Sequence, residues 1–213
     1  MKPVHHPEPD ELAQYASGAS PDHLSLVIAC HLTYCAECRD EVKLLEELGG
    51  ALLDSLPGGD GEMAPPEDLP PPAAREKRER APLPPEFRMI PRPIHAFLDG
   101  PPRFRFLAPG VKHVPLALTV GRIQAKVVRF SPGFVVPEHS HQGLEMVLVL
   151  EGELTDGATK EVFRNGDLSR REEGSRHTQH ITSEDPCVCL VVSTAEIVPS
   201  TFWGKVLKAL TGV

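Results

Sequence analysis

Apolar residues recur at helical spacing through the first fifty positions of the chain. The spacing predicts three helices, over residues 9–17, 21–35 and 36–48. Ser20, Pro21 and Asp22 supply a capping side chain, a proline and an early acid, in the order that begins a helix. Gly49 and Gly50 are expected to end the third helix. The first part of the chain is therefore predicted to be a small helical domain.

Beyond residue 95 the pattern changes to short apolar segments separated by turn residues. Strands are predicted at residues 116–120, 123–130, 146–150, 161–163 and 187–192. Regularly spaced strands with no helices between them are typical of a β-sandwich or barrel. The fold class expected is therefore α + β with two domains, a helical N-terminal domain and a C-terminal β-barrel.

The ends of these domains follow from composition. We place the helical domain at residues 1–80, a proline-rich linker at 81–95 and the barrel at 96–213. Residues 57–72 are rich in Pro, Gly and acids and indicate a connector, and residues 73–80 predict a charged helix. The tail is expected to be a helix on the barrel, with a membrane-surface role as the alternative, from the spacing of Phe202, Trp203, Val206, Leu207 and Leu210.

Composition and charge narrow the class of protein. The 213 residues contain no apolar run long enough for a membrane span, and the first residues do not read as a secretory signal. Five cysteines in two groups do not suggest an extracellular disulfide framework, so a bacterial-type cytoplasm is expected. Residues 1–70 carry three basic and fourteen acidic residues, a net charge of −11. This part should not bind nucleic acid directly. It could attract a basic protein surface, and the alternative is an acidic helix surface that faces only solvent.

The helical part contains a candidate zinc site. On a helix, His31, Cys35 and Cys38 are spaced i, i+4 and i+7 and would project from one face. Two thiolates and an imidazole suit zinc, and a structural site needs a fourth ligand, which His5 or His6 could supply. Such a metal would also stabilise a domain too small for a large core. The alternative is a reduced helix with two ordinary cysteines and a surface histidine.

A second constellation lies among the predicted strands. His139 and His141 alternate on a strand and would point to the same side, Glu145 follows four residues later, and His177 comes after a turn at Gly174. This order resembles the two sequence motifs of the cupin superfamily, whose fold is a jelly-roll barrel. The resemblance implies that the four residues bind a second divalent metal, zinc or another transition metal, with open coordination positions. The alternative is a barrel that keeps its histidines without an ion.

The second motif departs from the usual cupin form. Glu172 and Glu173 stand where a proline usually precedes Gly174, and no asparagine follows His177. A pair of cysteines, Cys187 and Cys189, lies two positions apart on a later strand. They are either a redox pair or simply buried thiols.

A zinc helical module followed by a cupin resembles the ChrR family of zinc-binding anti-sigma factors. The resemblance is carried by His5-His6, His31 with Cys35 and Cys38, the Gly49-Gly50 pair, and Cys187-Val-Cys189. It implies that the helices bind and inhibit an extracytoplasmic-function-type sigma factor, which makes the protein a negative regulator of transcription and not an enzyme. It also implies release on singlet oxygen or peroxide stress through the cupin-like domain, and favours His6 over His5 as the fourth zinc ligand.

Two rival hypotheses belong to other classes. A cupin with three His and one Glu could be a metal-dependent dioxygenase or isomerase, with the zinc module as a docking piece. It could also be a small-molecule sensor with another partner. Neither a membrane nor a direct nucleic-acid partner is expected, and the pattern leaves the oligomeric state open.

Overall fold

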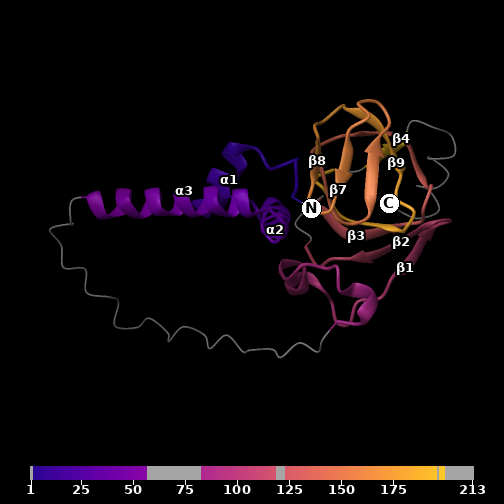
Figure 1. The fold of residues 1–213 in the computed structure, drawn as a ribbon, viewed down its shortest axis with the longest axis horizontal. Coiled ribbons are helices and arrows are strands. Elements are labelled where there is room, and N and C mark those ends of the chain that lie inside the picture. Colours follow the sequence, from indigo (N-terminus) through magenta and orange to yellow (C-terminus); the bar gives the residue numbers. More distant parts are fainter. Residues whose placement is uncertain (1, 57–82, 119–122, 196, 200–213) are drawn as a thin grey trace.

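A computed structural model of the chain describes residues 2–56, 83–118, 123–195 and 197–199. The helix predicted at residues 73–80 and the C-terminal helix lie outside these residues. The described helices are α1 (Pro9–Ala16), α2 (Asp22–His31) and α3 (Ala36–Ser55), with short 3-10 turns η1 (Pro85–Phe87) and η2 (Arg92–Phe97). In Figure 1, α3 points away from the strands, whereas α2 lies beside them.

Two details of the predicted helices are wrong. The hydroxyl of Ser20 does not cap α2; Pro21 takes the N-cap position, and Ser20 Oγ has no hydrogen-bond partner among the described residues. The third helix also does not stop at Gly49 and Gly50, but continues to Ser55. A helical glycine costs only about 1 kcal/mol relative to alanine, and the leucines on both sides are good helix formers, so the glycines do not end the helix.

The remaining chain forms two antiparallel sheets. The first has the order β1-β2-β3-β10-β5-β8 and the second β11-β4-β9-β6-β7. The strands are β1 (Arg105–Ala108), β2 (Val111–Pro115), β3 (Gln124–Phe130), β4 (Val135–His141), β5 (Glu145–Glu151), β6 (Glu153–Asp156), β7 (Val162–Arg164), β8 (Leu168–Arg171), β9 (Arg176–Ile181), β10 (Cys187–Ser193) and β11 (Ile197–Pro199). The cupin fold is confirmed, but the sheets face each other as a sandwich and do not close into a barrel (Figure 1).

One predicted strand is wrong in its described part. Residues 116–118 are irregular, and the strand lies just before them as β2. Leu116 still donates its amide to the carbonyl oxygen of Ala125 at 3.0 Å. Leu116 and Leu118 are buried there, which explains why they resemble the inward side of a strand.

The proline-rich segment is built into the core. Phe87 and Ile94 are fully buried, and Phe87 stacks on Phe104 with 4.8 Å between ring centroids. Val27 of α2 and Leu148 of β5 belong to the same apolar cluster as Ile94. The helices, the segment after residue 83 and the outer face of the six-stranded sheet therefore share one core. The division into residues 1–80, 81–95 and 96–213 stays a prediction.

Candidate metal centres

The first candidate centre forms at the corner between α2 and α3. The chain leaves α2 at His31, turns over residues 32–34 and enters α3 with Cys35 as its N-cap. The sequence reasoning placed His31, Cys35 and Cys38 on one helix face, and this is wrong. The corner nevertheless brings the three side chains together, because Cys35 precedes the first turn of α3 and Cys38 follows within it.

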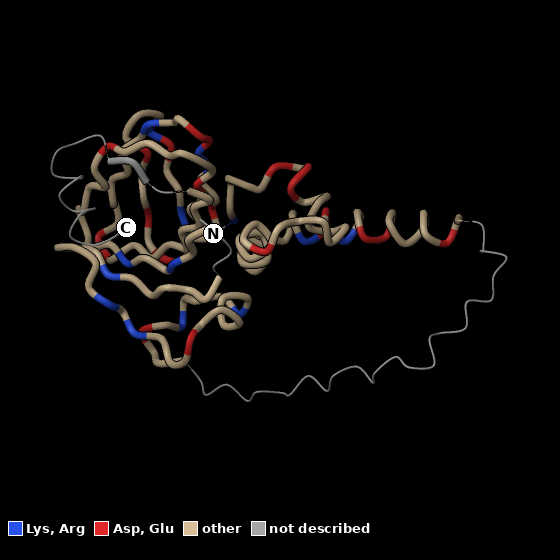
Figure 2. Tube along the Cα trace, turned by 180° about the vertical axis from the view of Figure 1, so that it is seen from behind, with Lys and Arg blue, Asp and Glu red and all other residues tan. Residues whose placement is uncertain are grey.

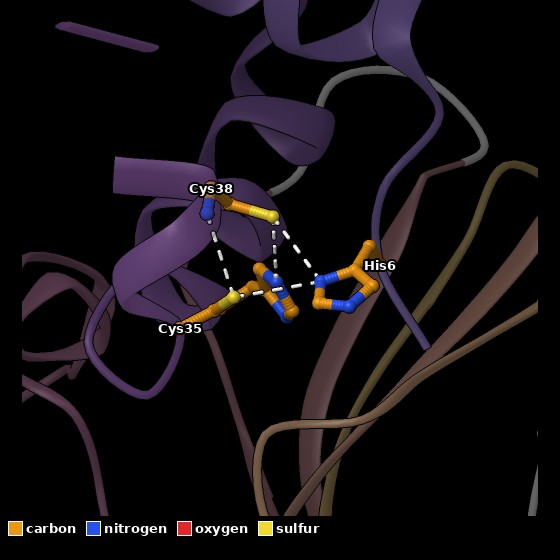
Figure 3. Close-up of side chains that lie close together, drawn as sticks. His6, Cys35 and Cys38 are labelled. Atoms are coloured by element: carbon orange, nitrogen blue, oxygen red, sulfur yellow. Dashed lines mark hydrogen bonds between the residues drawn. The ribbon is translucent and has the colours of Figure 1, made fainter. Parts of the chain in front are cut away.

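His6 completes this cluster from the N-terminal segment. Its Nδ1 atom lies 3.4 Å from Cys35 Sγ and 3.3 Å from Cys38 Sγ, and His31 Nε2 lies 3.3 Å from Cys38 Sγ (Figure 3). Ligands of a tetrahedral zinc are about 3.5 Å apart when one is nitrogen and the other sulfur. We call these four residues, His6, His31, Cys35 and Cys38, the helical centre.

The electrostatics of the helical centre favour a cation. Burial and the nearby Cys35 sulfur raise the pKa of Cys38 to about 12. Burial lowers the pKa of His31, so that its imidazole is neutral. The two cysteines can both ionise at this distance only with a positive charge between them, and the neutral His31 imidazole does not supply it. The residues present therefore fit a divalent ion with sulfur and nitrogen ligands.

Residues on the strand side of the molecule contact His31 and the segment that carries His6. His31 Nδ1 lies 2.7 Å from the carbonyl oxygen of Gly166, between β7 and β8. The backbone amides of Val4 and His5 donate to Asp167 Oδ1, at 2.7 and 3.0 Å. The His5 ring packs on Phe163 and stays outside the cluster. The sequence pattern assigned no role to Gly166 and Asp167.

The second candidate centre lies between the two sheets. His139 and His141 on β4, Glu145 at the start of β5 and His177 on β9 are all buried and their ligand atoms converge. His177 Nε2 is 2.9 Å from His141 Nε2 and 3.1 Å from His139 Nε2. Glu145 Oε2 lies 3.4 Å from His141 Nε2. We call these four residues the cupin centre.

Outer contacts orient the imidazoles of the cupin centre. His139 Nδ1 lies 2.8 Å from the carbonyl oxygen of Pro137, which as an acceptor leaves His139 Nε2 without a proton. Asp156 and Arg171 approach the Nδ1 side of His177. Sequence reasoning missed this pair, for which the spacing gives no signal.

Charge in the cupin centre also suits a cation. Burial lowers the pKa of His141 to about 4, so its imidazole is neutral. Burial alone would raise the pKa of Glu145, but the surrounding histidines outweigh it and lower that pKa. Three imidazoles and a carboxylate whose ligand atoms converge fit a divalent transition metal.

Cys187 and Cys189 lie on β10 inside the sandwich. Both are fully buried, and their sulfur atoms are 3.6 Å apart. The neighbouring Cys187 and burial raise the pKa of Cys189 well above its usual range. Cys189 is therefore held as a thiol, and an oxidant must penetrate the sandwich to reach the pair.

Comparisons with known proteins show which proteins this chain is similar to. Residues 102–196 match the family model for the ChrR cupin-like domain. The chain is 29% identical over 210 residues to the anti-sigma-E factor ChrR of Cereibacter sphaeroides, covering 96% of each protein. Residues 102–196 thus match the ChrR cupin-like domain, and the chain as a whole is similar to ChrR.

A solved structure extends the ChrR likeness to three dimensions. The crystal structure of Rhodobacter sphaeroides SigE in complex with the anti-sigma factor ChrR matches with a TM-score of 0.71 and 28% identity, over 90% of this chain and 100% of that one. KdgF from Halomonas matches 47% of the chain with a TM-score of 0.41. Among the residues that the structure describes, no helix combines the length and apolar character needed to cross a bilayer.

Proposed function

We propose that this protein is an anti-sigma factor that binds and inhibits an extracytoplasmic-function-type sigma factor. Binding depends on zinc at the helical centre, and singlet oxygen or peroxide stress sensed through the cupin domain releases the sigma factor. The observation that carries the proposal is the match to ChrR over nearly the whole of both chains, helices included. This match favours a regulator over the dioxygenase or isomerase hypothesis.

Helix α3 provides a surface of the kind that a partner would cover. Leu44, Leu48 and Leu52 lie four residues apart and are 66%, 57% and 60% exposed. We call these three residues the leucine row. Val42 and Leu45, in contrast, are turned inward, and α3 packs on α1. Exposed leucines in a row are typical of a protein interface.

The charge around the leucine row suits a basic partner. Acidic residues occur along most of the length of α3 (Figure 2): Glu37, Asp40, Glu41, Glu46, Glu47 and Asp54. A sigma factor carries basic surfaces for promoter DNA, and an acidic helix would cover these and slow their reaction with DNA. The apolar row and acidic rim together support a sigma factor as the occupant.

The helical centre explains why such a surface would need zinc. The three elements that carry its ligands are the N-terminal segment, the end of α2 and the start of α3. With zinc bound, His6, His31 and the two cysteines would cross-link these elements and fix the direction in which α3 leaves the corner. The cupin centre, or the buried Cys187–Cys189 pair, would then be the place where an oxidant acts.

The test is co-purification of the full chain with its sigma factor, which we expect the neighbouring gene to encode. Leu44→Lys with Leu48→Lys should abolish capture, whereas Phe106→Lys, a change at a side chain that is 72% exposed on β1, should not. Cys35→Ser with Cys38→Ser should abolish capture, and Cys30→Ala, at a buried cysteine outside the cluster, should not. Undiminished capture by both double variants would contradict the proposal.

The sensing step has its own test. His141→Ala with His177→Ala should leave sigma-factor binding intact but keep the complex together under singlet oxygen or peroxide. Release of the sigma factor at the wild-type rate from this variant would contradict sensing through the cupin centre.

A further inference from the structure

We propose that the Gly166–Asp167 turn of the cupin domain is a positioning element of the helical centre. It contacts the His31 imidazole and fixes the backbone immediately before His6, so that docking of the cupin domain strengthens metal binding at the helical centre. This inference rests on the metal centre proposed above and adds a role for residues that lie about 130 positions away from its cysteines.

The first contact concerns His31, which is fully buried. Its Nδ1 lies 2.7 Å from the carbonyl oxygen of Gly166, so Nδ1 must carry the proton and donate. A neutral imidazole has one N–H, and Nε2 therefore keeps its lone pair directed at the cluster, 3.3 Å from Cys38 Sγ. A metal-bound histidine almost always has such an acceptor behind it, and here the cupin domain supplies it.

The close approach of the turn requires a glycine. Gly166 has φ +88, and a Cβ at this position would lie 2.5 Å from Tyr34 Cβ and 2.7 Å from Pro3 Cγ. Tyr34 belongs to the corner between α2 and α3, and Pro3 to the segment that leads to His6. The turn is therefore wedged between the two pieces of chain that carry the imidazoles, where a side chain would push them away.

The second contact concerns the segment that carries His6. Asp167 is 2% exposed, and its Oδ1 accepts the amides of Val4 and His5 at 2.7 and 3.0 Å. Its Oδ2 accepts the amide of Arg164 at 2.8 Å, which fixes the carboxylate on the sheet. The Leu168 amide donates in turn to the carbonyl oxygen of His5 at 3.2 Å. Residues 4 and 5 are thereby fixed immediately before His6.

Strand β8 connects this turn with the cupin centre. It begins at Leu168, next to Asp167, and ends at Arg171. Arg171 lies opposite Glu145 in the β5–β8 pairing and contacts His177 and Asp156. A strand of four residues thus has one end at each centre, and a shift of Arg171 would be passed along it to Asp167.

The experiment loads the full chain with cobalt(II) and follows the thiolate-to-cobalt charge-transfer band. Only the helical centre gives this band, because the cupin centre has no sulfur ligand. Titration against a chelator should show that Gly166→Ala and Asp167→Ala raise the cobalt dissociation constant about 10–100-fold. Gly133→Ala is the matched control, since Gly133 also has positive φ but nothing lies within 4 Å of its Cβ position.

A further variant tests the contact between Asp167 and the N-terminal segment by changing the N-terminal segment. Val4→Pro removes the amide that donates to Asp167 at 2.7 Å, at a side chain that is 67% exposed, and leaves the cupin domain untouched. Val4→Pro should also raise the cobalt dissociation constant. Because this variant does not change the sheet, such a result would exclude misfolding of the sheet as the cause.

The outcomes separate the two proposals. If the wild-type chain gives no charge-transfer band, the helical centre itself is refuted. If the band forms and Gly166→Ala, Asp167→Ala and Val4→Pro all bind cobalt like the wild type, the positioning role is refuted and the metal centre stands. An equal loss of affinity in Gly133→Ala would also refute the positioning role, because general destabilisation would then explain the effect.

Discussion

Arg171 donates a hydrogen bond to Asp156 across 2.7 Å, and both residues contact the ring of His177 from its Nδ1 side. Asp156 is 1% exposed and also accepts the amides of Ala158 and Thr159 at 2.8 Å. Asp156 Oδ2 lies 3.6 Å from His177 Nδ1, and Arg171 Nε donates to the same nitrogen at 3.4 Å, so the two side chains together fix the orientation of the ring. Arg171 and Asp156 thus support the cupin centre from outside, although neither is one of its four residues.

Asp156→Asn tests this relationship. Asparagine preserves the shape of the side chain and an acceptor for the turn amides, but removes the charge beside His177. We expect divalent metal to bind the cupin centre about 10–100-fold more weakly, as measured by competition with a chelator. Asp185→Asn, at an exposed aspartate outside both centres, is the control. Equal affinity of Asp156→Asn and the wild type would show that the carboxylate does not act on His177.

Phe87→Ala tests whether the proline-rich segment stabilises the whole chain. Phe87 is fully buried and stacks on Phe104, so its removal leaves a cavity in the shared core. We expect a loss of about 3–5 kcal/mol in the free energy of unfolding, measured by denaturant titration. Phe106→Ala, at a side chain that is 72% exposed, should change it by less than about 0.5 kcal/mol. A similar small change for Phe87→Ala would indicate a segment that is not part of the core.

Gly49→Ala with Gly50→Ala tests the length of α3. Both glycines lie inside the helix, and nothing lies within 4 Å of either Cβ position. Alanine should stabilise the second half of α3 by about 0.5–1 kcal/mol per site. Hydrogen exchange of the amides after residue 48 should slow accordingly. If α3 ended at the glycines in solution, these amides would exchange fast in the wild type and circular dichroism would show a gain of helix.

Tyr34 gives the protein a specific alkaline sensitivity. Burial, with the nearby Cys30 and Glu151, raises the pKa of Tyr34 from 10.0 to about 12. The folded state thus keeps a proton that the unfolded chain has lost, and the stability from this group is full below pH 10 and disappears as the pH rises to about 12. The free energy of unfolding should fall less steeply over this interval in Tyr34→Phe than in the wild type. Parallel curves in urea titrations at several pH values would contradict this assignment.

The pattern of the sequence predicted most of the fold because the signals were local. The starts of α1 and α3 and the apolar residues of β3, β5 and β10 follow from short-range spacing, whereas the resemblance to the cupin motifs implied the set His139, His141, Glu145 and His177. The break after His31 was missed because its cause is tertiary. Tyr34 packs against Gly166, and the spacing of apolar residues within a helix cannot predict a contact with a residue 132 positions away.

The same limit applies to two features that spacing alone left open. A proline-rich segment resembles a linker in composition, and only its contacts with Phe104 and the shared core show that it is buried. Whether His5 or His6 joins the cysteines depends on which residue Asp167 and Phe163 hold, and both of these lie on the strand side of the molecule. Spacing predicted the ligand types of the helical centre, whereas distant parts of the chain decide its geometry.

The bond between Val4 and Asp167 spans 163 positions, which has a consequence for how the protein is made. The ribosome releases the first histidine of the helical centre long before the turn that fixes the residues next to it. Contacts between such distant residues form late, because they close a very large loop. In a nascent chain, the cysteines and histidines of the helical centre would therefore lack the support of this turn until the strands on either side of it have been synthesised.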